Sequence, residues 1–271
     1  MTRFVVAPQW QGSSSSRAMQ LMDGALAIAG DLPRSATTIL DVPAEAGESL
    51  GSGIRRLSSL TRVRAAIEEA IGLGDDPAIV VGGDCGVALA GVAAVAGEDL
   101  AVVWFDAHAD LNTTDTSPSG AFHGMVLRAI LGDGVDGMIV PTGRVTADRL
   151  ILAGTRELDL EEELYIGATG IRVFPPAELA DPEALAEAVA ATGAARVYIH
   201  VDLDVLDPGE IGALTHPVPF GLTPAELVAA IRAVRARLPL AGASLTEFSP
   251  ASAEAAVDDL GAILRVVGAL A

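Results

Sequence analysis

The chain has 271 residues, of which 51% are hydrophobic and 20% are charged. A chain of this length and composition can bury a sizeable core, which excludes a disordered protein. Its formal net charge of −19 excludes nucleic acid and anionic lipid as main partners, because both require a basic face.

The cysteine content and the apolar runs indicate the cellular compartment of the protein. Cys85 is the only cysteine, so no intrachain disulfide forms, which suits a reducing cytoplasm. The N-terminal segment lacks a long apolar core followed by a small-residue cleavage site, so no signal peptide is expected. No apolar run reaches membrane-spanning length without an interrupting Gly or charge. We therefore expect a soluble cytoplasmic protein without a membrane partner.

In chain order, the sequence predicts short apolar strands that alternate with helices. The first part predicts a strand at 4–7, a serine-rich loop at 9–16, a helix at 17–29, a strand at 38–42, a loop at 43–58 and a helix at 60–73. The rest predicts strands at 78–81, 100–105, 150–153, 171–174, 197–201 and 243–245, and helices at 87–96, 122–131, 160–165, 182–191, 223–237 and 252–270. Thr223 is the expected N-cap of its helix.

This alternation predicts βαβ units and a parallel sheet covered by helices on both faces, within a single domain spanning residues 1–271. Ligands of such sheets bind beyond the carboxyl ends of the strands. The polar clusters of the chain fall at those ends: 84–85, 106–110, 202–204 and 247. Asp84 and Asp207 are expected to be turn or cap residues.

The strongest local pattern is the sequence DAHAD. If the preceding strand continues through it, Asp106, His108 and Asp110 share one face, and a cation among them would offset the cost of burying their charges. The alternative is a polar loop with one surface histidine. Asp202 and Asp204 repeat the spacing, with a turn or cap as the alternative.

His200 shares the face of Asp202 and Asp204. We expect it to be a satisfied core histidine, with an auxiliary metal ligand or a donor to a carboxylate as alternatives. Carboxylates with an imidazole suit Mn²⁺, and also Co²⁺, Fe²⁺ or Zn²⁺. Shared carboxylates indicate two ions bridged by a hydroxide, as in two-metal hydrolases.

Five segments in order carry a family resemblance: GGDC at 82–85, DAHAD at 106–110, SPSGAFHGM at 117–125, DLDVLDP at 202–208 and TEF at 246–248. Together they resemble the arginase, agmatinase and formimidoylglutamase (ureohydrolase) family. The resemblance implies a three-layer α/β/α fold around a mostly parallel sheet of about eight strands, two manganese ions, and hydrolysis of a guanidino or formimino carbon–nitrogen bond. It also implies a homo-oligomer, a trimer or hexamer.

Carried over by position, the resemblance makes Asp106 and Asp202 the bridging metal ligands. Asp110 would complete the first site, and His108 and Asp204 the second. Cys85 stands where the family has a histidine ligand of the first metal. A thiolate still binds metals but favours Zn²⁺, Co²⁺ or Fe²⁺ over Mn²⁺. The alternative for Cys85 is a small buried residue that does not bind metal.

Three residues match the catalytic positions of the family. Asp110 would orient the hydroxide, and His123 would protonate the leaving amine. Glu247 would pair with the guanidinium of the substrate and so place its carbon. The alternatives are a helix cap for His123 and a surface position at a strand end for Glu247.

The resemblance also implies a set of residues that would hold the α-carboxylate and α-amino groups of arginine: Asn112, Ser117, Ser119, Asp159 and Glu162. Ala121 stands where arginases usually carry an asparagine. His216 is expected to lie in an exposed loop, with a position near the pocket, in place of a smaller residue of the family, as the alternative. L-arginine is the leading substrate, with agmatine, formimidoylglutamate or another guanidino compound as alternatives. A rival hypothesis is a non-catalytic family member that serves as a binding or regulatory protein.

Overall fold

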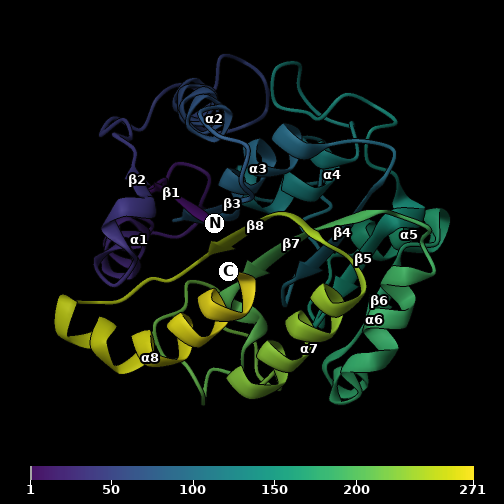
Figure 1. Ribbon diagram of the computed structural model, residues 1–271. Coiled ribbons are helices and arrows are strands. Elements are labelled where there is room, and N and C mark those ends of the chain that lie inside the picture. Colours follow the sequence, from purple (N-terminus) through teal and green to yellow (C-terminus); the bar gives the residue numbers. More distant parts are fainter. Residues whose placement is uncertain (1) are drawn as a thin grey trace.

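The structure, a computed structural model that describes residues 2–271, contains an eight-stranded sheet in which every neighbouring pair of strands is parallel (Figure 1). In spatial order its strands are β2 (Thr37–Ile39), β1 (Arg3–Ala7), β3 (Ala78–Gly82), β8 (Leu240–Thr246), β7 (Arg196–Asp202), β4 (Leu100–Phe105), β5 (Leu150–Ala153) and β6 (Arg172–Phe174). The predicted parallel α/β sheet is confirmed.

Helices cover both faces of the sheet, so the fold has three layers (Figure 1). One face carries α1 (Gln20–Gly30), α6 (Pro182–Ala190), α7 (Pro224–Arg237) and α8 (Ala253–Leu270). The other carries α2 (Leu57–Gly72), α3 (Ala88–Val95), α4 (Val126–Ile130) and α5 (Leu160–Thr169). Among residues 2–271, no helix is both long and apolar enough to cross a membrane.

The strands are nearly continuous apolar runs because both sides of the sheet are buried. All six residues of β4 are buried, and they alternate between the two cores. Val103 and Phe105 pack toward α1, α6, α7 and α8, whereas Val102 and Trp104 pack toward α2, α3 and α4. This alternation decides which side chains of β4 and β7 can meet at the site.

The structure confirms one predicted helix boundary and changes two others. The hydroxyl of Thr223 accepts from the Glu226 N–H in a capping box, which confirms the predicted N-cap of α7. The helix predicted at 122–131 is a 3₁₀ turn, Phe122–Met125, followed by the short α4. The helix predicted at 160–165 continues to Thr169, where Gly170 at φ 72° ends it.

The strand order brings separate parts of the sequence to one edge. β3, β8, β7 and β4 are consecutive neighbours in the sheet. The residues at or just past their carboxyl ends are Cys85, Glu247, Asp202 and Asp106 respectively. Parallel strands therefore place four of the predicted site residues side by side, although the chain separates them by up to 162 positions.

Candidate functional site

The DAHAD segment is not an extension of β4. The strand ends at Phe105, and Asp106 turns the chain by accepting the His108 N–H at 2.7 Å. The expected sharing of a strand face is therefore wrong, because this hydrogen bond bends the chain out of the sheet. The turn nevertheless brings His108 Nδ1 to 3.5 Å from Asp106 Oδ1 and to 3.0 Å from Asp204 Oδ2.

The second aspartate pair also lies on a turn. β7 ends at Asp202, whose carboxylate accepts the Asp204 N–H at 2.7 Å and so begins the 3₁₀ turn Leu203–Val205. Asp204 Oδ1 accepts the Ala107 N–H at 3.0 Å. The expected strand alternation is wrong here too, and the turn links this segment to the one that follows β4. In both Asp202 and Asp204, the second carboxylate oxygen, Oδ2, takes no part in these hydrogen bonds to the backbone.

Cys85 lies at the start of a 3₁₀ turn after β3 and is buried. Its thiol donates to Asp202 Oδ2 at 3.0 Å, and Sγ lies 3.2 Å from the Thr246 hydroxyl. Burial, followed by the charges of Asp202 and Asp110, raises the pKa of the thiol well above its usual value. Without a nearby cation the sulfur therefore stays protonated.

Three sets of side chains could each hold a metal ion, with ligand atoms within 4.8 Å of one another: Asp106, His108 and Asp204; Cys85, Asp202 and Glu247; Cys85, Asp106 and His200. The structure thus brings together five of the six predicted metal ligands. Asp110 is in none of these sets, but it is buried beside them and borders the same cavity. The third set adds His200, for which metal binding was only the alternative to a core position.

The electrostatics of this cluster favour a cation. Burial, followed by the charge of Asp204, raises the pKa of Asp106 to about 7, and the pKa values of Asp110, Asp202 and Glu247 are raised well above their usual range. For His108, burial opposes the charged form, but hydrogen bonds to Asp106 and Asp204 prevail and raise its pKa to about 12. Buried carboxylates that repel one another are stabilised by metal ions.

Unpartnered atoms lead to the same conclusion. Asp110 Oδ2 and both carboxylate oxygens of Glu247 are buried without a hydrogen-bond partner among the described residues. Both residues also adopt left-handed backbone conformations, at φ 53° and φ 67°. Such strain is costly for residues other than glycine and persists only where the surroundings hold it. Backbone bonds do so here: Asp110 O accepts from Leu127, and the Glu247 N–H donates to Gly83 O at 2.7 Å.

A cavity of about 220 Å³ opens over this cluster. His123 lies on its wall, with Nε2 3.1 Å from the Ser14 hydroxyl and its ring stacked on His216 at 5.1 Å between centroids. Burial, followed by the charges of His216 and His108, lowers the pKa of His123 to about 3. His216 was expected in an exposed loop, which is wrong: this stacking keeps it partly buried. Sequence reasoning also missed Ser14, which only a folded serine-rich loop could bring here.

The outer part of the cavity is lined by residues predicted to bind an amino acid. The Asn112 amide donates to Asp159 Oδ2 at 2.8 Å. Ser117 and Ser119 accept the N–H groups of Gly120 and Ala121 at 3.0 and 3.1 Å. Because these oxygens already accept, their hydroxyl protons can point into the cavity.

Glu162, predicted to bind substrate, borders the cavity but has both carboxylate oxygens engaged by the backbone. Oε1 accepts the Leu111 N–H and Oε2 the Asp159 N–H, each at 2.9 Å. It therefore holds the two cavity loops together, and direct contact with substrate stays a prediction. Asp84 and Asp207 are confirmed as turn residues, since each accepts backbone N–H bonds from its own turn.

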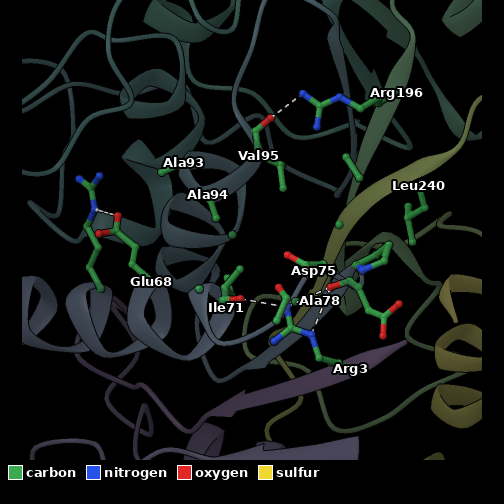
Figure 2. Close-up of a pocket in the computed structure, with 18 of the residues that line it drawn as sticks. Arg3, Glu68, Ile71, Asp75, Ala78, Ala93, Ala94, Val95, Arg196 and Leu240 are labelled. Atoms are coloured by element: carbon green, nitrogen blue, oxygen red, sulfur yellow. Dashed lines mark hydrogen bonds and ion pairs between the residues drawn. The ribbon is translucent and has the colours of Figure 1, made fainter. Parts of the chain in front are cut away.

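A larger cavity, of about 750 Å³, lies at the opposite edge of the sheet, where the strands begin (Figure 2). Its cationic side chains are already engaged. Arg3 donates to the carbonyls of Ile71 and Gly74, and Arg196 donates to Val95 and forms an ion pair with Asp99. Among residues 2–271, the three sets of side chains that could hold a metal ion all lie at the carboxyl edge.

Comparison with known proteins agrees with this geometry. A model of the Arginase family matches residues 8–267. N(omega)-hydroxy-L-arginine amidinohydrolase of Streptomyces lavendulae is 37% identical over 214 residues, which cover 77% of this chain and 74% of that protein. The arginase of Bacillus caldovelox is 32% identical over 228 residues, covering 78% and 76%. The crystal structure of Entamoeba histolytica arginase in complex with L-ornithine shares the fold, with a TM-score of 0.84 at 22% identity over 98% of each chain.

The three-layer fold and these relatives define a hydrolase that acts on amidino carbon–nitrogen bonds. The chain belongs to the arginase family.

Proposed function

We propose that this chain hydrolyses a guanidino amino acid to an amine and urea, or a substituted urea, with two bound divalent metal ions. The observation that carries the proposal is the buried carboxylate cluster, of which Asp110, Asp202 and Asp204 line the cavity. Asp110 Oδ2 has no hydrogen-bond partner among the described residues. Mn²⁺ is the metal proposed first, and Co²⁺, Fe²⁺ or Zn²⁺ are alternatives because Cys85 supplies a soft ligand.

The residues proposed to hold the two ions are those that the family resemblance implies. Asp106 and Asp202 would contact both ions, Cys85 and Asp110 the first, and His108 and Asp204 the second. The proximity of Asp106, His108 and Asp204, and of Cys85 to Asp202, supports this assignment. Divalent ions bound here would neutralise the carboxylates and lower the pKa of the water molecule that attacks the guanidino carbon.

Glu247 would bind the guanidinium group of the substrate. Its two oxygens are buried and have no partner among the described residues, and a planar guanidinium supplies two parallel N–H donors to a carboxylate. The hydrogen bond from the Glu247 N–H to Gly83 O holds the backbone of this residue in its left-handed conformation. Asp110 Oδ2, likewise unpartnered, would accept a hydrogen bond from the attacking water and orient it.

His123 would transfer a proton to the leaving amine. Its ring lies on the cavity wall beside Ser14 and His216, within the same pocket as His108 and Asp110. Because its pKa is lowered to about 3, the ring is neutral near pH 7. A neutral imidazole accepts a proton at one nitrogen and releases one at the other, so His123 would relay protons rather than store one.

An amino acid substrate is favoured over agmatine by the outer part of the cavity. Asp159 offers a carboxylate to an α-ammonium group, and the hydroxyls of Ser117 and Ser119 and the Asn112 amide could donate to an α-carboxylate. Agmatine has no carboxylate to use those donors. L-arginine remains the leading substrate, and the 37% identity to the Streptomyces lavendulae enzyme adds N(omega)-hydroxy-L-arginine. Formimidoylglutamate is a further alternative.

The test is a steady-state screen of product release by chelator-treated protein reloaded with each metal in turn. The substrates are L-arginine, N(omega)-hydroxy-L-arginine, agmatine and formimidoylglutamate. We expect turnover of an amino acid substrate, abolished by chelator and restored by metal. No turnover of any substrate with any metal would contradict an enzymatic role and favour the non-catalytic alternative.

The oligomeric state, the cellular compartment and the partners of the enzyme are also proposals. We infer a homo-oligomer, a trimer or hexamer, in the cytoplasm, where the single thiol stays reduced. Exposed apolar side chains such as Met19, Leu160 and Phe220 are available for contacts between subunits. The acidic charge supports the absence of nucleic-acid and membrane partners. Light scattering of the purified protein measures the oligomeric state.

A further inference from the structure

His200 is a buried histidine with one engaged nitrogen and one free nitrogen. Nδ1 lies 2.7 Å from the Ser244 hydroxyl, whereas Nε2 is buried with no hydrogen-bond partner among the described residues. The ring stacks on Trp104, with centroids 3.6 Å apart and planes 21° apart. The expectation of a fully satisfied core histidine is therefore wrong. A buried nitrogen without a partner is costly, and a bound metal ion would satisfy it.

The position of His200 on β7 points its ring toward the carboxylate cluster. Its neighbours Ile199 and Val201 belong to the core beneath α7 and α8, so His200 lies on the other face, with Trp104. The Trp104 indole N–H donates to Asp106 Oδ2 at 3.0 Å. A ring nitrogen of His200, Cys85 Sγ and a carboxylate oxygen of Asp106 all lie within 4.8 Å of one another.

We propose that Nε2 of His200 is a ligand of the first metal ion, together with Cys85 and Asp106. The inference rests on the proposed metal-dependent function and adds to it a residue from the middle of a strand. It changes the chemistry of the site, because one sulfur, one imidazole and carboxylates form a set that suits Zn²⁺ or Co²⁺ better than Mn²⁺.

Ser244 can accept a hydrogen bond from the tautomer that metal binding requires. With its hydrogen on Nδ1, His200 would donate to the Ser244 hydroxyl and leave the lone pair on Nε2 free for the metal, which is the usual orientation of a metal-bound histidine. The thiol of Cys85 loses its proton to solvent when the ion binds, and Asp202 then loses the hydrogen bond that it now accepts from the sulfur.

The stack on Trp104 offers a competing explanation, in which His200 only fills the core. Substitutions separate the two. His200→Phe keeps an aromatic ring beside Trp104 but removes the ligand nitrogen. Tyr198→Phe is the matched control, because Tyr198 is buried on the same face two residues earlier and its hydroxyl also lacks a partner among the described residues.

The experiment is equilibrium dialysis of each protein against Co²⁺, followed by metal analysis and an absorption spectrum. We expect two ions per chain and a thiolate-to-cobalt charge-transfer band in wild type and Tyr198→Phe. We expect His200→Phe to bind the first ion at least 10-fold more weakly, with loss of that band at limiting metal. Equal affinities and the same spectrum in His200→Phe would overturn the inference.

A second measurement needs no substitution. X-ray absorption of the wild-type protein loaded with Zn²⁺ should show a sulfur neighbour at about 2.3 Å and imidazole scattering from two histidines per pair of ions, His108 and His200. Scattering from only one imidazole would overturn the inference and leave the proposed function standing. A wild-type protein that binds no metal and turns over no substrate would contradict both.

Discussion

His108 Nδ1 lies 3.0 Å from Asp204 Oδ2, and this contact joins the turn after β4 to the turn after β7. Asp204 also accepts the Ala107 N–H, so the two turns are linked by side chain and backbone. In the absence of metal, the proton on His108 is the positive charge that this part of the cluster holds. A metal ion bound by Asp106, His108 and Asp204 would therefore have to displace this proton.

Removal of metal should make stability fall as the pH rises. The folded, metal-free protein keeps a proton on His108, whose pKa is raised to about 12, and on carboxyls whose pKa values are raised, such as Asp110 and Glu247. The unfolded chain releases these protons below or near pH 7. Between pH 7 and 8.5 the folded state thus binds more protons, and its free energy of unfolding falls by about 1.4 kcal/mol per pH unit for each extra proton.

Urea unfolding at pH 7 and pH 8.5, with chelator and with metal, measures this effect. The metal-loaded protein should not lose stability over the same range, because metal binding displaces the protons and strengthens as they leave. A metal-free protein with the same unfolding midpoint at both pH values would argue against the proton-loaded cluster.

Replacing Glu247 with Gln should weaken substrate binding without removing metal. The amide loses the charge that pairs with the guanidinium, and a hydrogen bond to a charged group contributes about 1.5–3 kcal/mol. We expect kcat/KM to fall about 10- to 150-fold, while the bound metal remains at the wild-type level. Glu254→Gln, at an exposed position in the first turn of α8, is the matched control and should match wild type. A loss of metal in Glu247→Gln would instead identify Glu247 as a metal ligand.

Replacing His123 with Asn should lower kcat with little change in the free energy of unfolding. The ring lies on the cavity wall beside Ser14, and removal of a proton-transferring group costs about 10²- to 10⁴-fold in rate. Added imidazole should restore part of the activity by entering the space left beside His216. If kcat is unchanged in His123→Asn, the ring only shapes the cavity.

Glu162→Ala should destabilise the protein. The side chain is buried and binds the N–H groups of Leu111 and Asp159 from two different loops. Loss of these bonds should lower the free energy of unfolding by about 2–4 kcal/mol, because the Leu111 and Asp159 N–H groups lose their partner. Glu161→Ala, at the neighbouring exposed position, should change it by less than about 0.5 kcal/mol. Equal unfolding midpoints for both variants would show that Glu162 holds no loop.

The sequence predicts the sheet and the meeting of Cys85, Asp106, Asp202 and Glu247, because apolar strands alternating with helices imply parallel order and parallel strands end at one edge. The sequence does not predict that the chain leaves the strand at Asp106. An alternation of aspartate, alanine and histidine is compatible with a strand, and it is equally compatible with a turn that side-chain hydrogen bonds close. His216 was misplaced because its burial depends on a stacking partner 93 positions away. The free nitrogen of His200 likewise depends on neighbours from β4 and β8.

The central claim is that the carboxylate cluster is a two-metal site. The most direct measurement is the metal content of the wild-type protein after loading with Mn²⁺ or with Co²⁺ and removal of unbound ions. The account predicts two ions per chain. A protein that retains no metal, or whose metal survives unchanged when Asp202 is replaced by Asn, would contradict it.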